Sequence, residues 1–177
     1  TLQKFIYYTE VELLLNNDKN KASLKEEITE TGEQELEEES QIIARKFNRE
    51  ADIELNLKPF NIKISSFHFE VIIANIVDNA FKFSNKGDKV IIEVELDDTH
   101  VHITVIDNGL GFNEVTLNQI GAFTQFNRSK MEQQGLGLGL ITSKKLIDFY
   151  EGELSICGNK PKGSCVKLSL LINAKKP

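Results

Sequence analysis

The spacing of apolar and polar residues divides most of the chain into alternating helices and strands. Apolar residues three and four positions apart predict helices at 31–49, 65–83 and 136–150. Alternating residues and short apolar runs predict strands at 21–25, 52–57, 89–96, 101–105, 153–157 and 164–172. Strands in hairpins, mixed with helices, predict an α/β (α+β) fold, a two-layer sandwich with one mixed, mostly antiparallel sheet and helices on one face.

The same periodicity selects the side chains that we expect to face the core. In the helix at 31–49 they are Ile42, Ile43 and Phe47. In the helix at 136–150 they are Leu140, Ile141, Leu146, Ile147 and Phe149. At the N-terminus, helical spacing joins Leu2, Phe5, Ile6, Thr9 and Leu13. We expect this segment to end a helix that begins upstream and packs on something outside this chain.

The helix that contains EVIIANIVDNAFKFS, from Glu70 to Ser84, is mostly apolar but carries one polar stripe. Asn75, Asn79 and Lys82 stand at i, i+4 and i+7, so they share one face. Two amides and an ammonium among apolar residues are costly unless something satisfies them. Either the stripe faces water, or a ligand that brings oxygens and a cation satisfies all three.

Composition and charge narrow the class of protein. The chain has 177 residues, of which 40% are hydrophobic and 27% charged, as in one globular domain. Its formal net charge of −6 argues against nucleic acid as a partner, because a phosphate backbone needs a basic surface. No apolar run approaches the roughly eighteen residues of a membrane span. The chain begins with Thr1 rather than Met, so we expect a piece of a longer protein.

Two cysteines, Cys157 and Cys165, flank the turn-rich loop 158–163. We expect them to face each other across a hairpin. Two cysteines in a chain of this size do not indicate a disulfide scaffold, so we expect both thiols to be reduced and structural.

The segment DNGLG, from Asp107 to Gly111, follows the strand at 101–105. A carboxylate at a strand end can accept a hydrogen bond from an exocyclic amine such as that of adenine. Glycines let the backbone approach a flat ligand closely. Asp, Asn and Gly are also ordinary turn residues, so a plain strand-exit turn is the alternative.

A second glycine-rich segment, GLGLGL from Gly135 to Leu140, leads into the helix at 136–150. Free backbone N–H groups at a helix N-terminus suit a phosphate. No Lys-Ser/Thr follows, so the segment is not a Walker loop, and no strand precedes it as a Rossmann fingerprint requires. Residues 107–135 form a long connection poor in periodicity, which is typical of a lid.

The stripe, DNGLG and GLGLGL are far more specific together, in this order, than any one of them alone. Over about residues 50–172 the sequence resembles the catalytic ATP-binding domain of sensor histidine kinases, of the Bergerat-fold superfamily shared with gyrase and the heat-shock chaperones. EVIIANIVDNAFKFS resembles the N-box, DNGLG the G1 box and GLGLGL the G2 box. AFTQF, with Phe123 and Phe126, resembles the phenylalanine motif of the ATP lid, and the closing Glu151-Gly-Glu-Leu…Lys-Gly-Ser164 also fits.

The resemblance implies roles for the residues of the stripe. Asn79 binds Mg²⁺ through its side-chain oxygen, and Asn75 supports the phosphates or the metal. Lys82 reaches a phosphate as a point charge. Phe83 either packs on adenine or belongs to the core.

The resemblance also implies roles for the two glycine-rich segments. Asp107 reads adenine, and Gly109 and Gly111 make room for it. Arg128, in the lid, meets the γ-phosphate or is a surface arginine. Some family members carry a second lid arginine where this chain has Gln133 and Gln134, which puts that contact in doubt. The phosphates are cradled by the segment that contains Gly135, Gly137, Gly139 and Leu140.

Asn75 separates two branches of the superfamily. The ATP hydrolases place Glu one turn before the metal-binding Asn, where it activates water. An amide cannot act as a general base near neutral pH. The resemblance therefore implies a site that holds Mg-ATP while a histidine imidazole supplies the nucleophile. His68, His100 and His102 do not precede a Glu as in the family's dimerisation helix, so we expect them to be structural or surface histidines.

The implied activity is that of a protein-histidine kinase, which transfers the γ-phosphoryl group to a dimerisation domain outside this chain and so signals to a response regulator. Residues 1–20 are then the remnant of the dimerisation helix and linker, and 21–177 the ATP-binding catalytic domain. The implied parent is a homodimer, the domain is cytoplasmic, and little turnover is expected from the domain alone. The alternatives are a degenerate nucleotide-sensing or interaction module and a gyrase-type ATP-driven clamp.

Overall fold

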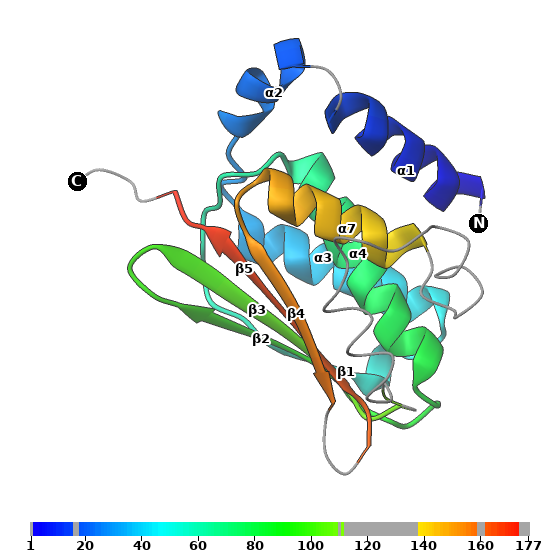
Figure 1. Cartoon of the computed structure of the whole chain (residues 1–177). Helices are drawn as coiled ribbons and strands as arrows, with labels where there is room; N and C mark the ends of the chain where they lie inside the picture. Colours follow the sequence, from blue (N-terminus) through cyan, green and yellow to red (C-terminus); the bar gives the residue numbers. More distant parts are fainter. Residues whose placement is uncertain (1, 16–17, 110, 112–137, 159–161, 174–177) are drawn as a thin grey trace.

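The computed structural model describes residues 2–15, 18–109, 111, 138–158 and 162–173 (Figure 1). These residues form the expected two-layer α/β sandwich, with a sheet on one side and helices on the other. Most of the predicted lid at 107–135 lies outside the described residues, and so do the predicted residues Phe123, Phe126, Arg128, Gln133, Gln134, Gly135 and Gly137.

Within the part of the chain that the structure describes, five strands form one open sheet in the order β1-β2-β3-β5-β4. They are β1 (Ile53–Asn56), β2 (Val90–Leu96), β3 (His100–Asp107), β4 (Glu153–Gly158) and β5 (Ser164–Leu171). β1 runs parallel to β2, whereas every other neighbouring pair is antiparallel. The prediction of a mixed, mostly antiparallel sheet is confirmed.

Helices cover one face of this sheet. The helical elements are α1 (Leu2–Leu15), α2 (Asp18–Lys25), α3 (Gly32–Lys46), the 3-10 turn η1 (Glu50–Asp52), α4 (Ser66–Phe83) and α7 (Leu138–Phe149). Figure 1 shows α3, α4 and α7 side by side over the sheet, with α1 and α2 farther out. The striped helix begins where expected, because Ser65 caps it by accepting a hydrogen bond from the backbone N–H of His68 at 3.3 Å.

The core lies between α4 and the inner face of the sheet. Burial alternates along β3, so its even-numbered residues lie on the face without helices and its odd-numbered ones face α4. Each large aliphatic side chain buried here contributes about 1.5–3 kcal/mol. The central members are Phe69, Ile72, Ile73, Ile76, Val90, Ile92, Val94, Val101, Ile103 and Val105.

Two details of the sequence prediction are wrong. The expected strand at 21–25 is part of helix α2, because Ala, Leu and Lys are good helix formers and an acidic residue, Asp18, stands at the start. Ile42 is 49% exposed rather than inward. The buried residues of α3 are instead Leu36, Ser40, Ile43 and Ala44, which follow helical spacing along one face. Residue 42 lies beside this face.

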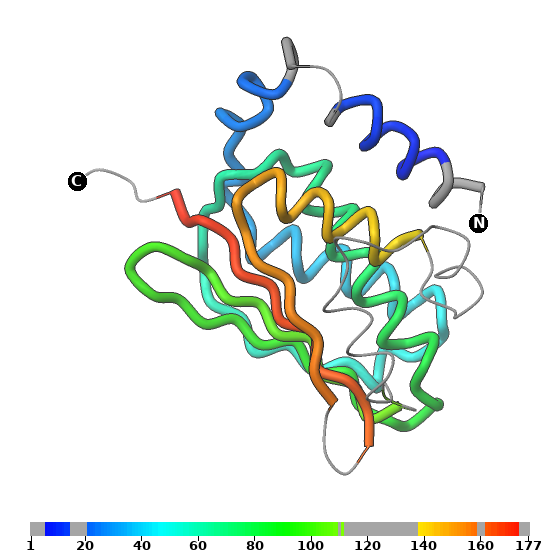
Figure 2. Tube along the Cα trace, in the orientation of Figure 1, coloured from blue at the N-terminus to red at the C-terminus, as the bar shows by residue number. Residues whose placement is uncertain are grey.

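The N-terminal helices lie on the outer surface of the helical layer. Figure 2 shows the trace of α1 beyond α7, and Lys145 of α7 forms an ion pair with Glu12 of α1. Val11 is buried, whereas Ile6 and Leu13 are exposed. The boundary expected between residues 20 and 21 falls inside α2, and the division of the chain there stays a prediction. Within the described residues, no helix has both the length and the apolar character needed to cross a membrane.

The two cysteines are register partners in the β4–β5 hairpin, as expected. Both thiols are free, and the Cys157 Sγ lies 3.4 Å from the backbone oxygen of Cys165.

Candidate functional site

Asp107 is a buried carboxylate at the C-terminal end of β3, with 4% of its surface exposed. Its Oδ1 accepts hydrogen bonds from the backbone N–H groups of Gly109, at 2.8 Å, and Ser164, at 3.3 Å. Burial raises the pKa of Asp107 above its ordinary value, and these hydrogen bonds oppose that rise. A carboxylate buried at a strand end is costly, which makes it a candidate for binding rather than for stability.

A small cavity lies beside Asp107, between α4, α7 and the sheet. The cavity measures about 20 Å³, space for about one water molecule, so its composition and not its size points to a ligand. Most of the lining is apolar, and Asn79, Asp107 and Ser164 supply the polar groups, as suits a flat heterocycle with a few hydrogen-bonding atoms. The fold thus brings together residues that the sequence places in the N-box, G1 and G2 segments. The lining residues are Ile76, Asn79, Ala80, Phe83, Val105, Asp107, Leu140, Ser164 and Val166.

The DNGLG glycines allow close approach of two backbone segments. A Cβ on Gly109 would lie 2.2 Å from the Phe83 carbonyl oxygen, so residue 109 has no room for a side chain. Gly111 has φ +73°, and a Cβ there would lie 2.7 Å from the Gly163 oxygen. The space that these glycines leave free is filled by the protein's own backbone, and this holds Asp107 against the end of α4. Their contact with a ligand stays a prediction.

The polar stripe of α4 runs from the interior to the surface. Asn75 is 6% exposed, Asn79 is half-buried and Lys82 is exposed. The alternative that the whole stripe simply faces water is therefore wrong for Asn75. The Lys82 Nζ lies 5.1 Å from the centre of the Phe83 ring, so a cation and a half-buried aromatic ring stand together at the end of the helix.

The N-terminus of α7 lies against Asn75. A Cβ on Gly139 would lie 2.4 Å from the Asn75 Oδ1 and 2.9 Å from its Cγ. Only glycine lets α7 begin at this distance from α4. The structure therefore joins the G2 segment to the polar stripe, and the roles of both toward a ligand stay predictions.

Two residues that support Asp107 were not among the predicted site residues. Ser164 donates its backbone N–H to the Asp107 carboxylate. Gly163 has φ +108°, and it has no room for a Cβ, because that atom would lie 1.9 Å from the backbone oxygen of Asp107. The sequence feature that could have indicated Gly163 and Ser164 is the closing Lys-Gly-Ser164 segment, which is part of the family resemblance. Arg49, which contacts the end of α4, was also missed, and no local pattern pointed to it.

A larger hollow, of about 450 Å³, lies over α3 and α4 on the other side of Asn75. Its charged groups are the carboxylates of Glu39, Glu70 and Asp78 and the ammonium of Lys46. The Lys46 Nζ is paired with Asp78 at 2.6 Å, and burial together with Glu70 raises the pKa of Glu39. Such an acidic lining repels phosphate, so the cavity beside Asp107 is the better candidate site for a nucleotide.

Each of the three histidines has a hydrogen-bonding partner. The His68 Nδ1 lies 2.7 Å from the buried Tyr150 hydroxyl. On the hairpin, the His102 Nε2 lies 2.7 Å from Asp97, and the His100 Nδ1 contacts the Thr99 hydroxyl at the same distance. His68 is thus a buried group, and His100 and His102 lie on the hairpin; that none of the three is a phosphoacceptor stays a prediction.

Comparison with known proteins identifies the family. Residues 65–174 match the family described as histidine kinase-, DNA gyrase B- and HSP90-like ATPase. Sporulation kinase D of Bacillus subtilis (strain 168) is 30% identical over 129 residues, which cover 72% of this chain and 25% of that protein. The chain spans about a quarter or less of the length of the first curated relatives that it matches.

Solved structures show the same fold. The mycobacterial sensor histidine kinase MprB superposes with a TM-score of 0.68 at 21% identity, covering 83% of this chain and 99% of that one. Full-length ShkA in complex with AMPPNP gives a TM-score of 0.64 at 22% identity, covering 82% of this chain and 31% of that one. The expected Bergerat fold is confirmed.

Proposed function

Because the chain belongs to the histidine kinase-, DNA gyrase B- and HSP90-like ATPase family, we propose that it binds Mg-ATP and transfers the γ-phosphoryl group to a histidine of a dimerisation domain. That domain lies outside this chain, and the phosphoryl group passes on to a response regulator. Sporulation kinase D and histidine protein kinase 1 are named as kinases and are several times longer than this chain, so the activity and partners of the whole protein, a homodimer, belong to the proposal.

One observation carries the nucleotide part of the proposal. Asp107 is a carboxylate held in the wall of a mostly apolar cavity by the N–H groups of Gly109 and Ser164. A carboxylate accepts a hydrogen bond from the exocyclic amine of adenine, and Phe83 and Leu140 offer apolar contact to the ring. The purine is thus selected by one charged acceptor among apolar walls.

The residues around the cavity also suit phosphate and Mg²⁺. The Asn79 side chain is half-buried at the cavity and offers an amide oxygen, the type of ligand that Mg²⁺ prefers. The exposed ammonium of Lys82, one turn further along α4, is available to a phosphate. Bound Mg²⁺ would neutralise charge on the phosphates. Gly135, Gly137, Gly139 and Arg128 complete the proposed phosphate site by family resemblance.

Asn75 favours phosphoryl transfer over hydrolysis. Its amide supplies no general base, and its Oδ1 lies against α7 rather than at an open surface. Phosphoryl transfer depends on positioning and charge stabilisation, which amides, glycines and cations provide. The chain holds and orients the nucleotide, and the histidine of the dimerisation domain supplies the nucleophile.

The test is titration of the chain with a non-hydrolysable ATP analogue and Mg²⁺, followed by incubation of the chain with ATP and a separate dimerisation domain. We expect saturable binding, very slow hydrolysis by the chain alone, and phosphorylation of the added domain. Binding without phosphorylation would indicate a nucleotide-sensing module, and brisk hydrolysis would indicate an ATP-driven clamp. Absence of binding at millimolar nucleotide would refute the proposal.

A further inference from the structure

Arg49 is a buried arginine between α3 and β1, and only 5% of it is exposed. Its backbone is fixed by the end of α3, because its N–H donates to the Ala44 oxygen at 2.9 Å and the preceding Asn48 has φ +53°. The side chain therefore starts from a defined point and extends toward α4.

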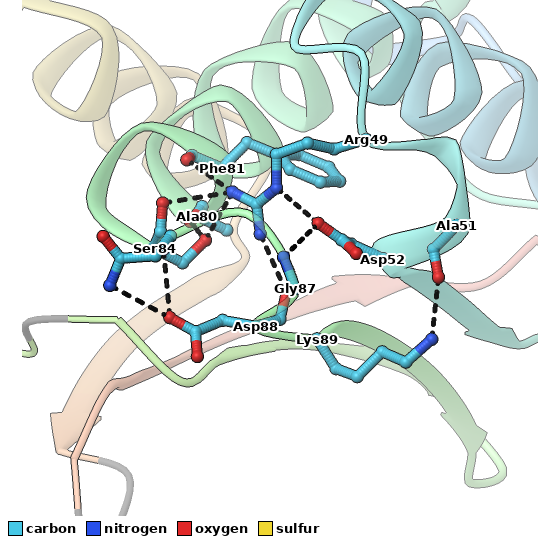
Figure 3. A network of polar contacts seen from close by, with 10 residues as sticks. Arg49, Ala51, Asp52, Ala80, Phe81, Ser84, Gly87, Asp88 and Lys89 are labelled. Carbon is cyan, nitrogen blue, oxygen red and sulfur yellow. Dashed lines mark hydrogen bonds and ion pairs between the residues drawn. The ribbon is translucent and has the colours of Figure 1, made fainter.

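The guanidinium group of Arg49 binds three backbone oxygens, the Ser84 hydroxyl and one carboxylate (Figure 3). Nη1 donates to the Phe81 oxygen at 3.0 Å and the Ser84 oxygen at 3.1 Å. Nη2 donates to the Asp88 oxygen at 2.8 Å, and Nε donates to Asp52 Oδ2 at 2.7 Å. Two of these backbone oxygens close α4, and the third belongs to the turn that leads into β2.

These contacts meet a specific need of the helix end. The last carbonyl groups of a helix have no partner within it, and the C-terminus carries a partial negative charge. A planar guanidinium spreads five N–H donors over three nitrogens and so reaches oxygens on several sides, whereas the three donors of a lysine ammonium lie on one atom. The Arg49 guanidinium also lies 4.9 Å from the centre of the Phe81 ring. Asp52 orients it from the other side and accepts the Gly87 N–H at 2.9 Å.

The residues between the anchored oxygens are those proposed to meet the nucleotide. Lys82 and Phe83 lie between Phe81 and Ser84 in the chain. Phe83 lines the cavity with Asp107, and the Phe83 oxygen lies where a side chain at Gly109 would have to be. A shift of the α4 end would therefore move the Phe83 ring, the Lys82 ammonium and the wall beside Asp107 together.

We propose that Arg49 is a positioning residue for nucleotide binding, which fixes the last turn of α4 so that Phe83 and Lys82 hold their places beside Asp107. Arg49 acts through these residues and does not itself contact the nucleotide. This inference rests on the proposed function, because it assumes that the cavity binds a nucleotide.

The experiment compares nucleotide affinity with stability in three variants of this chain. Arg49→Lys keeps the charge but loses the planar guanidinium, and Asp52→Asn keeps the guanidinium but weakens its orientation. Val94→Ala removes apolar contact from the core at a position that does not line the cavity. The Kd for Mg-ADP and for the ATP analogue is measured by calorimetry, and the melting temperature without nucleotide is recorded for each variant.

We expect Arg49→Lys to raise the Kd about tenfold and Asp52→Asn about threefold, because small displacements of a binding group cost this much affinity. Val94→Ala should lower the melting temperature and leave the Kd within about twofold of the wild type. With an added dimerisation domain, Arg49→Lys should raise the KM for ATP and leave kcat at saturating ATP close to the wild type.

The outcomes separate the two proposals. A wild-type chain that binds no nucleotide overturns the proposed function. If the wild type binds nucleotide and Arg49→Lys has the same Kd, the positioning role alone is overturned. The same holds if the Kd of Val94→Ala rises as much as that of Arg49→Lys. If Arg49→Lys does not fold, Asp52→Asn decides, and an unchanged Kd in that variant overturns the role.

Discussion

The Gly139 Cα lies so close to Asn75 that a Cβ on residue 139 would be 2.4 Å from the Asn75 Oδ1. This contact joins the first turn of α7 to the middle of α4. In the sequence, β2 and β3 lie between these two helices. The distance between the two helices at the candidate phosphate site is therefore set by the absence of a single methyl group.

Gly139→Ala should separate α7 from α4. The overlap with Asn75 costs about 1–3 kcal/mol, because the buried amide has little room to move. We expect a lower melting temperature and a weaker Kd for the ATP analogue. Gly158→Ala is the matched control, since a Cβ there meets nothing within 4 Å. Equal affinities in the two variants would contradict a role for this contact in binding.

Asp107→Asn should lose affinity for adenine nucleotides without losing stability. Burial raises the pKa of Asp107, so its charged form costs stability in the folded protein. The pKa of an aspartate in the unfolded chain is about 4, so the stability of the wild type should fall relative to the variant as the pH rises above that value. Unfolding by urea between pH 3 and 7 and nucleotide titration at pH 7 measure the two effects. The exposed Asp98→Asn should change neither.

His68 should make stability depend on pH in the opposite sense. Burial lowers the pKa of His68, so the unfolded chain binds a proton before the folded one does. The free energy of unfolding should therefore decrease as the pH falls below about 6.5. His68→Gln should flatten this dependence between pH 7 and 5, measured by thermal melts of the variant and the wild type. Parallel curves for the two proteins would exclude this role for His68.

The two cysteines should differ in reactivity although they are register partners. Cys157 is exposed, whereas burial raises the pKa of Cys165 to about 11. Alkylation proceeds through the thiolate, so iodoacetamide at pH 8 should label Cys157 first. Peptide mass spectrometry over time measures both rates, and the chain unfolded in guanidinium chloride should show similar rates at both sites. Faster labelling of Cys165 in the folded chain would contradict the structure.

Local patterns were sufficient for the central elements of the fold. The mostly apolar segment from Phe69 to Phe81 predicted α4, and the alternation of apolar and polar residues predicted the β2–β3 hairpin. Burial on one face imposes such a period on the sequence. The segment at 21–25 was predicted wrongly. Its five residues are too few for a period to be visible, and helix propensity decided the structure.

The candidate site was predictable only where its residues stand in motifs. Asp107 and Gly139 are in glycine-rich segments with a recognisable composition. Arg49 binds backbone oxygens some thirty to forty positions further along the chain, and a carbonyl oxygen carries no side-chain signature. Such contacts depend on how the elements pack, so neither periodicity nor a motif could indicate them.

The strand order has a consequence for synthesis on the ribosome. β5 follows β4 in the sequence but lies between β3 and β4 in the sheet, and it donates the Ser164 N–H to Asp107. Until its residues have left the exit tunnel, the nascent chain has an open strand edge on β3 and lacks one wall of the cavity. The nascent chain would gain affinity for a nucleotide only after β5 has been translated and has paired with β3.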